Sequence, residues 1–150
     1  MQKIYNLWLA VAAFTLMLFS NLSLAIDNPD APDLVAQFET REKPFIIAIE
    51  KQNNTTSDYS VAFANYLKFL DKELNTIYKT LRAKLPEEKQ KQLKASQLSW
   101  IKYRDLELSF IDNTWTNKDF GTASAISRGQ YKAGVVRNRV IQLMHYTKAF

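Results

Sequence analysis

Apolar residues recur at three- and four-residue steps along three long stretches of the chain, which is the period of an amphipathic α-helix. These stretches span about residues 57–84, 86–115 and 122–148. Residues 117–121 separate the second stretch from the third and are typical of a break, with Gly121 as the residue of positive φ. The pattern therefore predicts an all-α protein.

Local signals mark where the first two helices start and how they are joined. Thr55 followed three residues later by Asp58 has the spacing of a capping box. Pro86 suits the first position of the second helix because its ring fixes φ. Only residues 84–86 link the two helices, and so short a link makes them antiparallel neighbours. We expect an elongated helical hairpin with the third long helix packed against it.

Residues 26–54 form an acidic arm ahead of the predicted helical domain, which we place at residues 55–150. The apolar spacing near residue 35 indicates one or two helical turns, and Pro44 interrupts them. Residues 45–49 have a periodicity that fits a helix or a strand. We favour a short helical segment here, since a lone strand would have no sheet to join.

The first 25 residues resemble a secretory signal peptide. Lys3 precedes an apolar run over residues 7–19, and Ser23 and Ala25 are the small residues expected at a cleavage site. An uncleaved membrane anchor is the rival interpretation, but the run is shorter than the roughly 20 residues that a spanning helix needs. We expect cleavage near Ala25 and a periplasmic or secreted protein.

The composition disfavours an enzyme. The chain has no cysteine and one histidine (His145), which excludes thiolate nucleophiles and the usual Cys/His metal sites. Its three glycines also argue against a glycine-rich phosphate-binding loop. Glycosidase chemistry needs two convergent carboxylates, whereas Asp105 and Glu107 diverge on a helix. We therefore expect no catalytic residues, no cofactor and no metal.

Charge is unevenly distributed along the chain. Residues 26–58 carry seven acids and three bases, a net charge of −4, whereas residues 59–150 carry sixteen bases and eight acids, a net charge of +8. Either the acidic arm lies on the basic body, or the body binds an anionic partner such as lipid head groups or peptidoglycan. We expect no nucleic acid, because no reading helix or aromatic platform is recognisable. The candidate basic surface consists of Lys84, Lys89, Lys91 and Lys94, together with the third-helix bases Arg128, Lys132, Arg137 and Arg139.

The second helix carries polar side chains where a plain amphipathic helix would have aliphatic ones. Gln97, Trp100 and Arg104 share one face. Counting outward from the turn places Asn75 near Gln97 and Asp71 near Trp100. A buried arginine at position 104 needs a carboxylate such as that of Asp71. The hairpin would then enclose Trp100 and Arg104 and leave only its exterior for function. In preference to a ligand groove, we predict an internal polar network of Asp71, Asn75, Tyr78, Gln97, Trp100 and Arg104.

Two motifs together carry a resemblance to a known family. They are D-x-x-L-N-x-x-Y over residues 71–78 and Q-x-x-W-x-x-x-R-D over residues 97–105. In combination they resemble the LprI-type lysozyme inhibitor domain, a small exported helical module of bacteria, over about residues 55–143. Residues 139–143 fit the end of that domain more loosely.

The resemblance implies a partner and a departure. Members usually carry cysteines, and the corresponding positions here are Ala62, Leu108 and about Tyr131, so this chain is a cysteine-free variant whose apolar replacements we expect to be buried. The implied function is binding of lysozyme or another envelope protein by occlusion. The alternative is an envelope stress or scaffold module that binds anionic lipid or peptidoglycan. The candidate acids for the partner surface are Asp105, Glu107 and Asp112.

Overall fold

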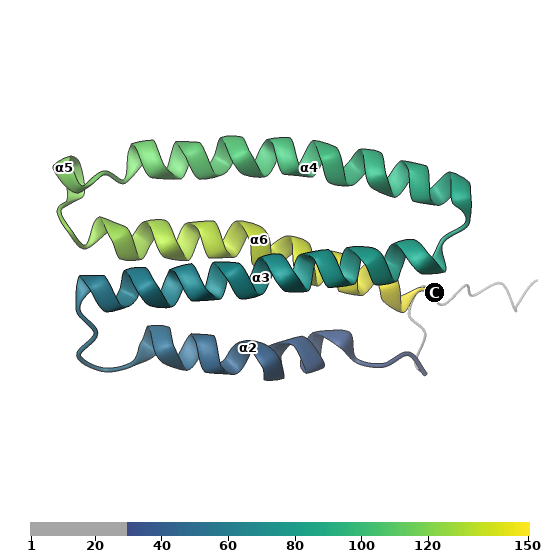
Figure 1. The fold of residues 1–150 in the computed structure, drawn as a ribbon, viewed down its shortest axis with the longest axis horizontal. Coiled ribbons are helices and arrows are strands. Elements are labelled where there is room, and N and C mark those ends of the chain that lie inside the picture. Colours follow the sequence, from purple (N-terminus) through teal and green to yellow (C-terminus); the bar gives the residue numbers. More distant parts are fainter. Residues whose placement is uncertain (1–29) are drawn as a thin grey trace, which may run out of the picture.

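The computed structural model describes residues 30–150 and is all-α over that part of the chain. Four long helices run along one common direction and give an elongated molecule (Figure 1). A short fifth helix lies at one end. The elements in chain order are α2 (Leu34–Glu50), α3 (Thr56–Lys84), α4 (Glu87–Thr114), α5 (Asn117–Phe120) and α6 (Ser124–Lys148).

The predicted helix boundaries agree closely with the structure. Thr55 caps α3, and its side chain and that of Asp58 form the reciprocal bonds of a capping box. Pro86 has the expected φ of −64°, but it is the cap residue of α4 and the helix starts one position later. Gly121 has φ of +67° and ends α5. The predicted break at 117–121 is therefore a single helical turn followed by a glycine.

The prediction that Pro44 interrupts the N-terminal segment is wrong. The helix α2 runs continuously over 17 residues with Pro44 inside it. Proline removes one backbone hydrogen bond from a helix, and contacts with the rest of the protein offset that loss. Phe38 is fully buried in the main core, and its ring stacks on Phe69 of α3 at a centroid distance of 5.8 Å.

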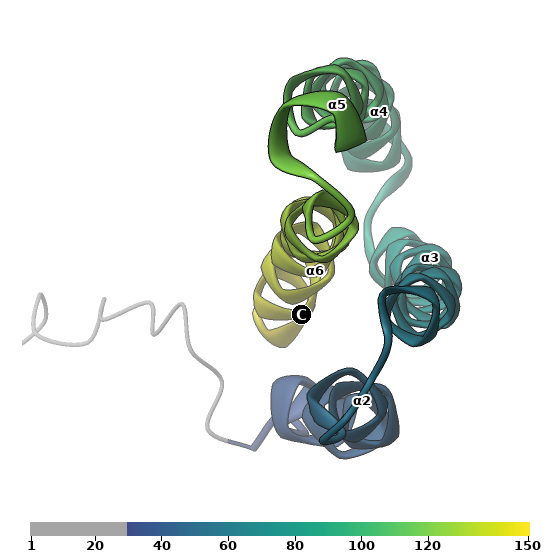
Figure 2. The ribbon, with the colours of Figure 1, turned by 90° about the vertical axis from the view of Figure 1, so that its left-hand side faces the viewer.

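Seen end on, the four long helices form three layers (Figure 2). The middle layer holds α3 and α6, which make the most extensive contact in the fold. The helix α2 covers one side of this pair and α4 covers the other. The main core lies between α3 and α6, where Leu70, Leu81, Val140 and Leu143 are essentially inaccessible to solvent.

The hairpin of α3 and α4 is antiparallel, as the short link requires, but the two helices do not pack along their length. The helix α4 packs mainly on α6. Only Gln97 and Ile111 of its 28 residues are buried. The third long helix, α6, packs against both helices of the hairpin, as expected, and it is α6 that holds α4 on the molecule.

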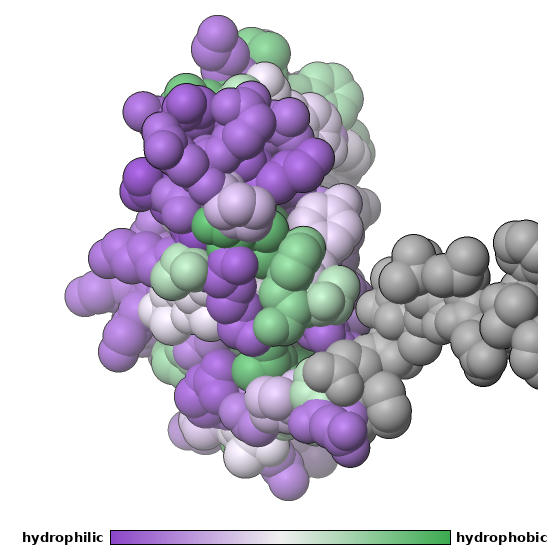
Figure 3. Space-filling view, turned by 90° about the vertical axis from the view of Figure 1, so that its right-hand side faces the viewer, coloured by the Kyte–Doolittle hydropathy of each residue, from purple (hydrophilic) through white to green (hydrophobic). Residues whose placement is uncertain are grey.

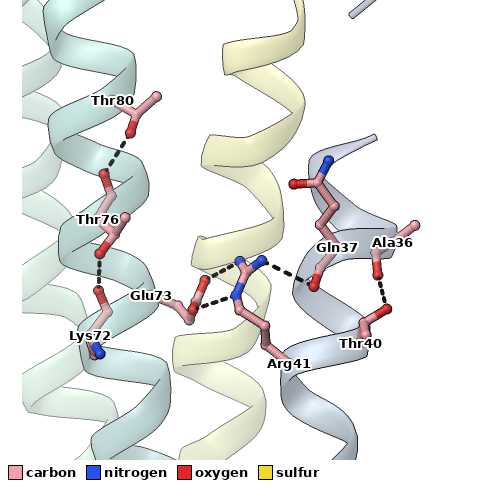
Figure 4. A network of polar contacts seen from close by, with 8 residues as sticks. All are labelled: Ala36, Gln37, Thr40, Arg41, Lys72, Glu73, Thr76 and Thr80. Atoms are coloured by element: carbon pink, nitrogen blue, oxygen red, sulfur yellow. Dashed lines mark hydrogen bonds and ion pairs between the residues drawn. The ribbon is translucent and has the colours of Figure 1, made fainter. Parts of the chain in front are cut away.

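Charged contacts hold the acidic segment on the body. Nε and Nη2 of Arg41 on α2 donate to the two carboxylate oxygens of Glu73 on α3, at 2.9 and 2.7 Å (Figure 4). At the next residue of α2 the charges are reversed, because the buried carboxylate of Glu42 accepts from Nε and Nη2 of Arg137 on α6, at 2.8 and 2.9 Å. The acidic segment is therefore docked on the body, as the first of the two explanations of the charge asymmetry expects.

No helix within residues 30–150 is both long and apolar enough to cross a membrane. The predicted signal peptide and its cleavage site near Ala25 lie outside the described residues.

Candidate protein-binding surface

The helix α4 leaves large apolar side chains in solvent. Tyr103, Leu106 and Phe110 follow one another at steps of three and four residues and therefore share one stripe of the helix. All three are more than half exposed, and Leu106 reaches 74%. We call these three residues the α4 stripe. A soluble surface seldom carries such a row without a binding role.

An open groove of about 630 Å³ runs beside this stripe, between α4 and α6. Its aromatic lining comes from both helices, because α4 packs on α6 without filling the space. The ring of Trp115 lies 4.7 Å from that of Tyr131 and 5.9 Å from that of Phe110, measured between centroids. The residues that line the groove from α4 include Trp100, Tyr103, Glu107, Phe110 and Ile111, and those from α6 include Tyr131, Gly134, Val135, Asn138 and Arg139.

Trp100 lines the groove, and two guanidinium groups lie close to its ring. Cζ of Arg104 lies 5.5 Å from the centre of the indole ring, and Cζ of Arg139 lies 5.8 Å from it. Both distances are within the range of cation–π attraction. The expectation that the hairpin encloses Trp100 is wrong, because α4 stands over α6 and the indole lines an open groove.

Arg104 contacts carboxylates of both α3 and its own helix. Its nearest partner is Asp105, at 2.7 Å from Nη2, and Asp71 of α3 is 4.0 Å from Nη1. Asp71 and Asp105 are both largely exposed. The cross-helix pair therefore exists at the predicted place, but water surrounds its acidic member.

The other members of the predicted network lie apart from this pair. Asn75 donates to the backbone oxygen of Asp71 within α3, and Tyr78 packs at the edge of the main core. Gln97 is buried and accepts a hydrogen bond from Nε of Arg139 at 3.1 Å. Gln97 thus pairs across to α6 and not to Asn75 of α3, since α6 is the helix on which α4 packs.

The three candidate acids differ in their availability. Asp105 pairs with Arg104, and Asp112 accepts from Lys132 at 2.5 Å and lies 3.9 Å from Nε of Arg128. Glu107 is half-buried and lines the groove. Two of the acids therefore already have cationic partners.

The candidate lysines gather at the end of the molecule that holds the α3–α4 turn. Hydrophilic side chains cover the upper part of this end, where α4 begins (Figure 3). Lys84, Lys89, Lys91 and Lys94 are all exposed. Lys91 lies 3.3 Å from Glu87 and 3.7 Å from Glu88. The surface is therefore a mixture of both charges.

Among residues 30–150, no group of three or more acidic or histidine side chains is arranged to hold a metal ion. The single histidine, His145, is exposed in the last turn of α6.

Comparison with protein families places these features in context. The family model described as lysozyme inhibitor LprI matches residues 48–143, which is more than half of the chain. The chain belongs to the LprI lysozyme inhibitor family. This match starts in the last turns of α2, earlier than the residue 55 expected from the motifs. No curated protein and no solved structure matches the chain.

The family resemblance led us to expect buried apolar residues at three positions that usually hold cysteine. Ala62 and Leu108 are half-buried and Tyr131 is exposed, so that expectation is wrong. The positions lie on α3, α4 and α6 respectively. Without cross-links, the protein depends on packing between α3 and α6.

Arg139 was expected only as one base of an exposed basic surface, whereas it is the buried cation of the groove. Its signal is present in the chain, because Arg139 falls between Val136, Val140 and Leu143 on the apolar stripe of the third helix. A charged residue at such a position needs a reason.

Proposed function

We propose that this LprI-family protein is an exported, non-enzymatic protein of the cell envelope that binds a lysozyme-like protein and blocks it by occlusion. We further propose that the α4 stripe and the adjoining groove form the contact surface. Membership of a family of lysozyme inhibitors supports the kind of partner. The pattern of the first 25 residues supports export.

The observation that carries this choice of surface is the exposure of the α4 stripe beside an aromatic groove. Tyrosine, tryptophan and phenylalanine are enriched at protein interfaces because each buries a large area at a small cost in side-chain entropy. A partner could contact the exposed side chains of the α4 stripe and also insert a side chain into the adjoining groove. The helix α4 has few buried contacts of its own, so the stripe is open to another chain.

The charges favour an apolar contact over an electrostatic one. Animal-type lysozymes are strongly basic, and this chain carries a net charge of +5, so the two gain no general attraction. Asp105 and Asp112 already have cationic partners, and Glu42 of the acidic segment is buried. Inhibition should therefore change little with salt.

The test is the clearing of a bacterial cell-wall suspension by lysozyme in the presence of the purified protein. We expect clearing to slow in proportion to added protein at micromolar concentration, and at both 50 mM and 300 mM salt. If lysozyme cleared the suspension at the same rate at every concentration of the added protein, the proposal would be wrong. Binding of the protein to anionic vesicles or to peptidoglycan that weakens steeply with salt, without slower clearing, would favour the basic surface instead.

A further inference from the structure

Arg139 stands apart from the other arginines of the described chain. Four of these, Arg41, Arg104, Arg128 and Arg137, are partly exposed, and each has a carboxylate oxygen within 4.0 Å. Arg82 has no such ion pair within residues 30–150, but it is exposed to solvent near the end of α3. Arg139 is only 7% exposed, yet no carboxylate of residues 30–150 forms an ion pair with it. Among the arginines of residues 30–150, Arg139 is thus the one that is buried without a countercharge.

The neighbours of Arg139 are neutral acceptors. Its Nε donates to Oε1 of Gln97 at 3.1 Å, Nη1 to Oε1 of Gln142 at 2.6 Å, and Nη2 to Oγ of Ser96 at 3.3 Å. These bonds use three of the five N–H donors of a guanidinium. Burial lowers the pKa of Arg139 because desolvation disfavours its charged form. Its charge is therefore held in position with donors to spare and nothing to neutralise it.

Although Arg139 is only 7% exposed, it lines the open groove between α4 and α6. Arg139 and Gln142 line the groove together with Trp100 and Tyr131, and Gly134 leaves the middle of α6 without a side chain. A methyl group placed on Gly134 would meet nothing within 4 Å. Glu107 is the one acidic residue of the lining, on the α4 side. The groove therefore offers one cation, aromatic walls and one repelling carboxylate.

We propose that the α4–α6 groove binds a protruding segment of a partner protein that carries a single acidic side chain flanked by apolar residues. The acidic side chain pairs with Arg139, and the apolar neighbours contact Trp100 and Tyr131. Glu107 disfavours a second acidic residue in the segment. This inference deepens the proposed function, on which it rests for the surface, by stating the chemistry of the partner.

The probe is a hexapeptide with blocked ends and one central glutamate between leucine and phenylalanine residues, compared with the same peptide carrying glutamine. Binding is followed by ¹H–¹⁵N NMR at the Arg139 Nε–H and Trp100 Nε1–H signals of the full chain. We expect the glutamate peptide to shift both signals and to bind at least tenfold more tightly than the glutamine peptide. Equal affinity for the two peptides, or no shift with either, would overturn the inference.

Three variants locate the site. Arg139→Gln should abolish the preference for glutamate, and Lys89→Gln, which removes an equal charge from an exposed position, should retain it. Because Arg139 is buried and its variant could fail to fold, Gly134→Leu provides a second route, since it fills open space in the groove. We expect Gly134→Leu to weaken the glutamate peptide at least tenfold. Unchanged binding by folded Gly134→Leu would contradict the inference.

The lysozyme assay separates this inference from the proposed function. Peptide selectivity without slower cell-wall clearing would leave the groove chemistry standing and remove lysozyme as the partner. Slower clearing without peptide selectivity would leave the proposed function standing and remove the acidic segment.

Discussion

The carboxylate of Glu42 accepts from Nε and Nη2 of Arg137 at 2.8 and 2.9 Å, across 95 residues of chain. The Tyr66 hydroxyl donates to the same carboxylate. Helices α2, α3 and α6 thus meet at one buried acid. The acidic segment is therefore an integral part of the bundle, held there by Glu42.

Loss of this buried acid should cost far more stability than loss of its exposed neighbour. The Glu42 side chain is 5% exposed, whereas that of Glu39 is 56% exposed and lies 3.5 Å from Arg137. Glu42→Ala should lower the free energy of unfolding by about 2–3 kcal/mol, at the lower end for a broken buried pair because Arg137 is a third exposed. Glu39→Ala should lower it by less than about 1 kcal/mol. Urea denaturation checks both, and equal losses would show that burial does not decide the outcome.

The same site predicts a specific alkaline response. Burial, and then the hydrogen bond to Glu42, raise the pKa of Tyr66 above its ordinary value near 10. The unfolded chain therefore loses this proton first as the pH rises, and the folded state loses up to about 1.4 kcal/mol per pH unit above roughly pH 10.

Tyr66→Phe removes this contribution. The difference in unfolding free energy between the natural protein and Tyr66→Phe should be constant below about pH 10 and should shrink above it. Denaturation series at pH 8 and at pH 11 provide the comparison. A difference that stays the same at both values would mean that Tyr66 ionises alike in the folded and unfolded states.

Two glycines of α6 should respond to alanine with opposite signs. A Cβ on Gly129 would lie 2.4 Å from ring atoms of Phe63, where α6 approaches α3. Gly129→Ala should therefore destabilise by about 1–3 kcal/mol. Gly134→Ala meets open space and should stabilise by about 0.5–1 kcal/mol, because alanine is the better helix former. Melting temperatures that move in the same direction for both would contradict the close approach of α3 and α6.

Arg104 should matter more than a solvent-exposed lysine, for a reason that the structure revises. Its guanidinium lies over Trp100, and its acidic partners are largely exposed, so packing on the indole is the main loss. Arg104→Ala should cost about 1 kcal/mol, and Lys91→Ala should change stability by less than about 0.5 kcal/mol. Thermal unfolding of the two variants is the measurement, and indistinguishable curves would count against a role for this contact.

The helices could be predicted from the sequence because their signals are local. Apolar residues recur with the helical period over residues 57–84, and Thr55 and Asp58 form a capping box at their start. The predicted bounds of α3 therefore differ from the observed ones by one residue. The helix through Pro44 could not be predicted in this way. Its stability comes from Phe38 and Glu42, whose partners lie on α3 and α6.

The arrangement of the helices depends on contacts between distant parts of the chain. A short link makes α3 and α4 antiparallel, but it does not make them pack, and α4 lies on α6 instead. The antiparallel register was enough to match Arg104 with Asp71 of α3. Gln97 was assigned to α3 as well, but it bonds to Arg139 because α4 packs on α6. The groove exists because α4 lies on α6. That Arg139 lines a groove could therefore be recognised only from the packing of the helices.

The most direct measurement compares Leu106→Asp with Val61→Asp in the lysozyme clearing assay. Leu106 lies in the α4 stripe, while Val61 is 59% exposed on α3, so both changes place a charge on an exposed apolar position. The account predicts that the natural protein and Val61→Asp slow clearing equally, and that Leu106→Asp loses at least nine-tenths of the effect. Full inhibition by folded Leu106→Asp would contradict the claim that this protein acts through α4.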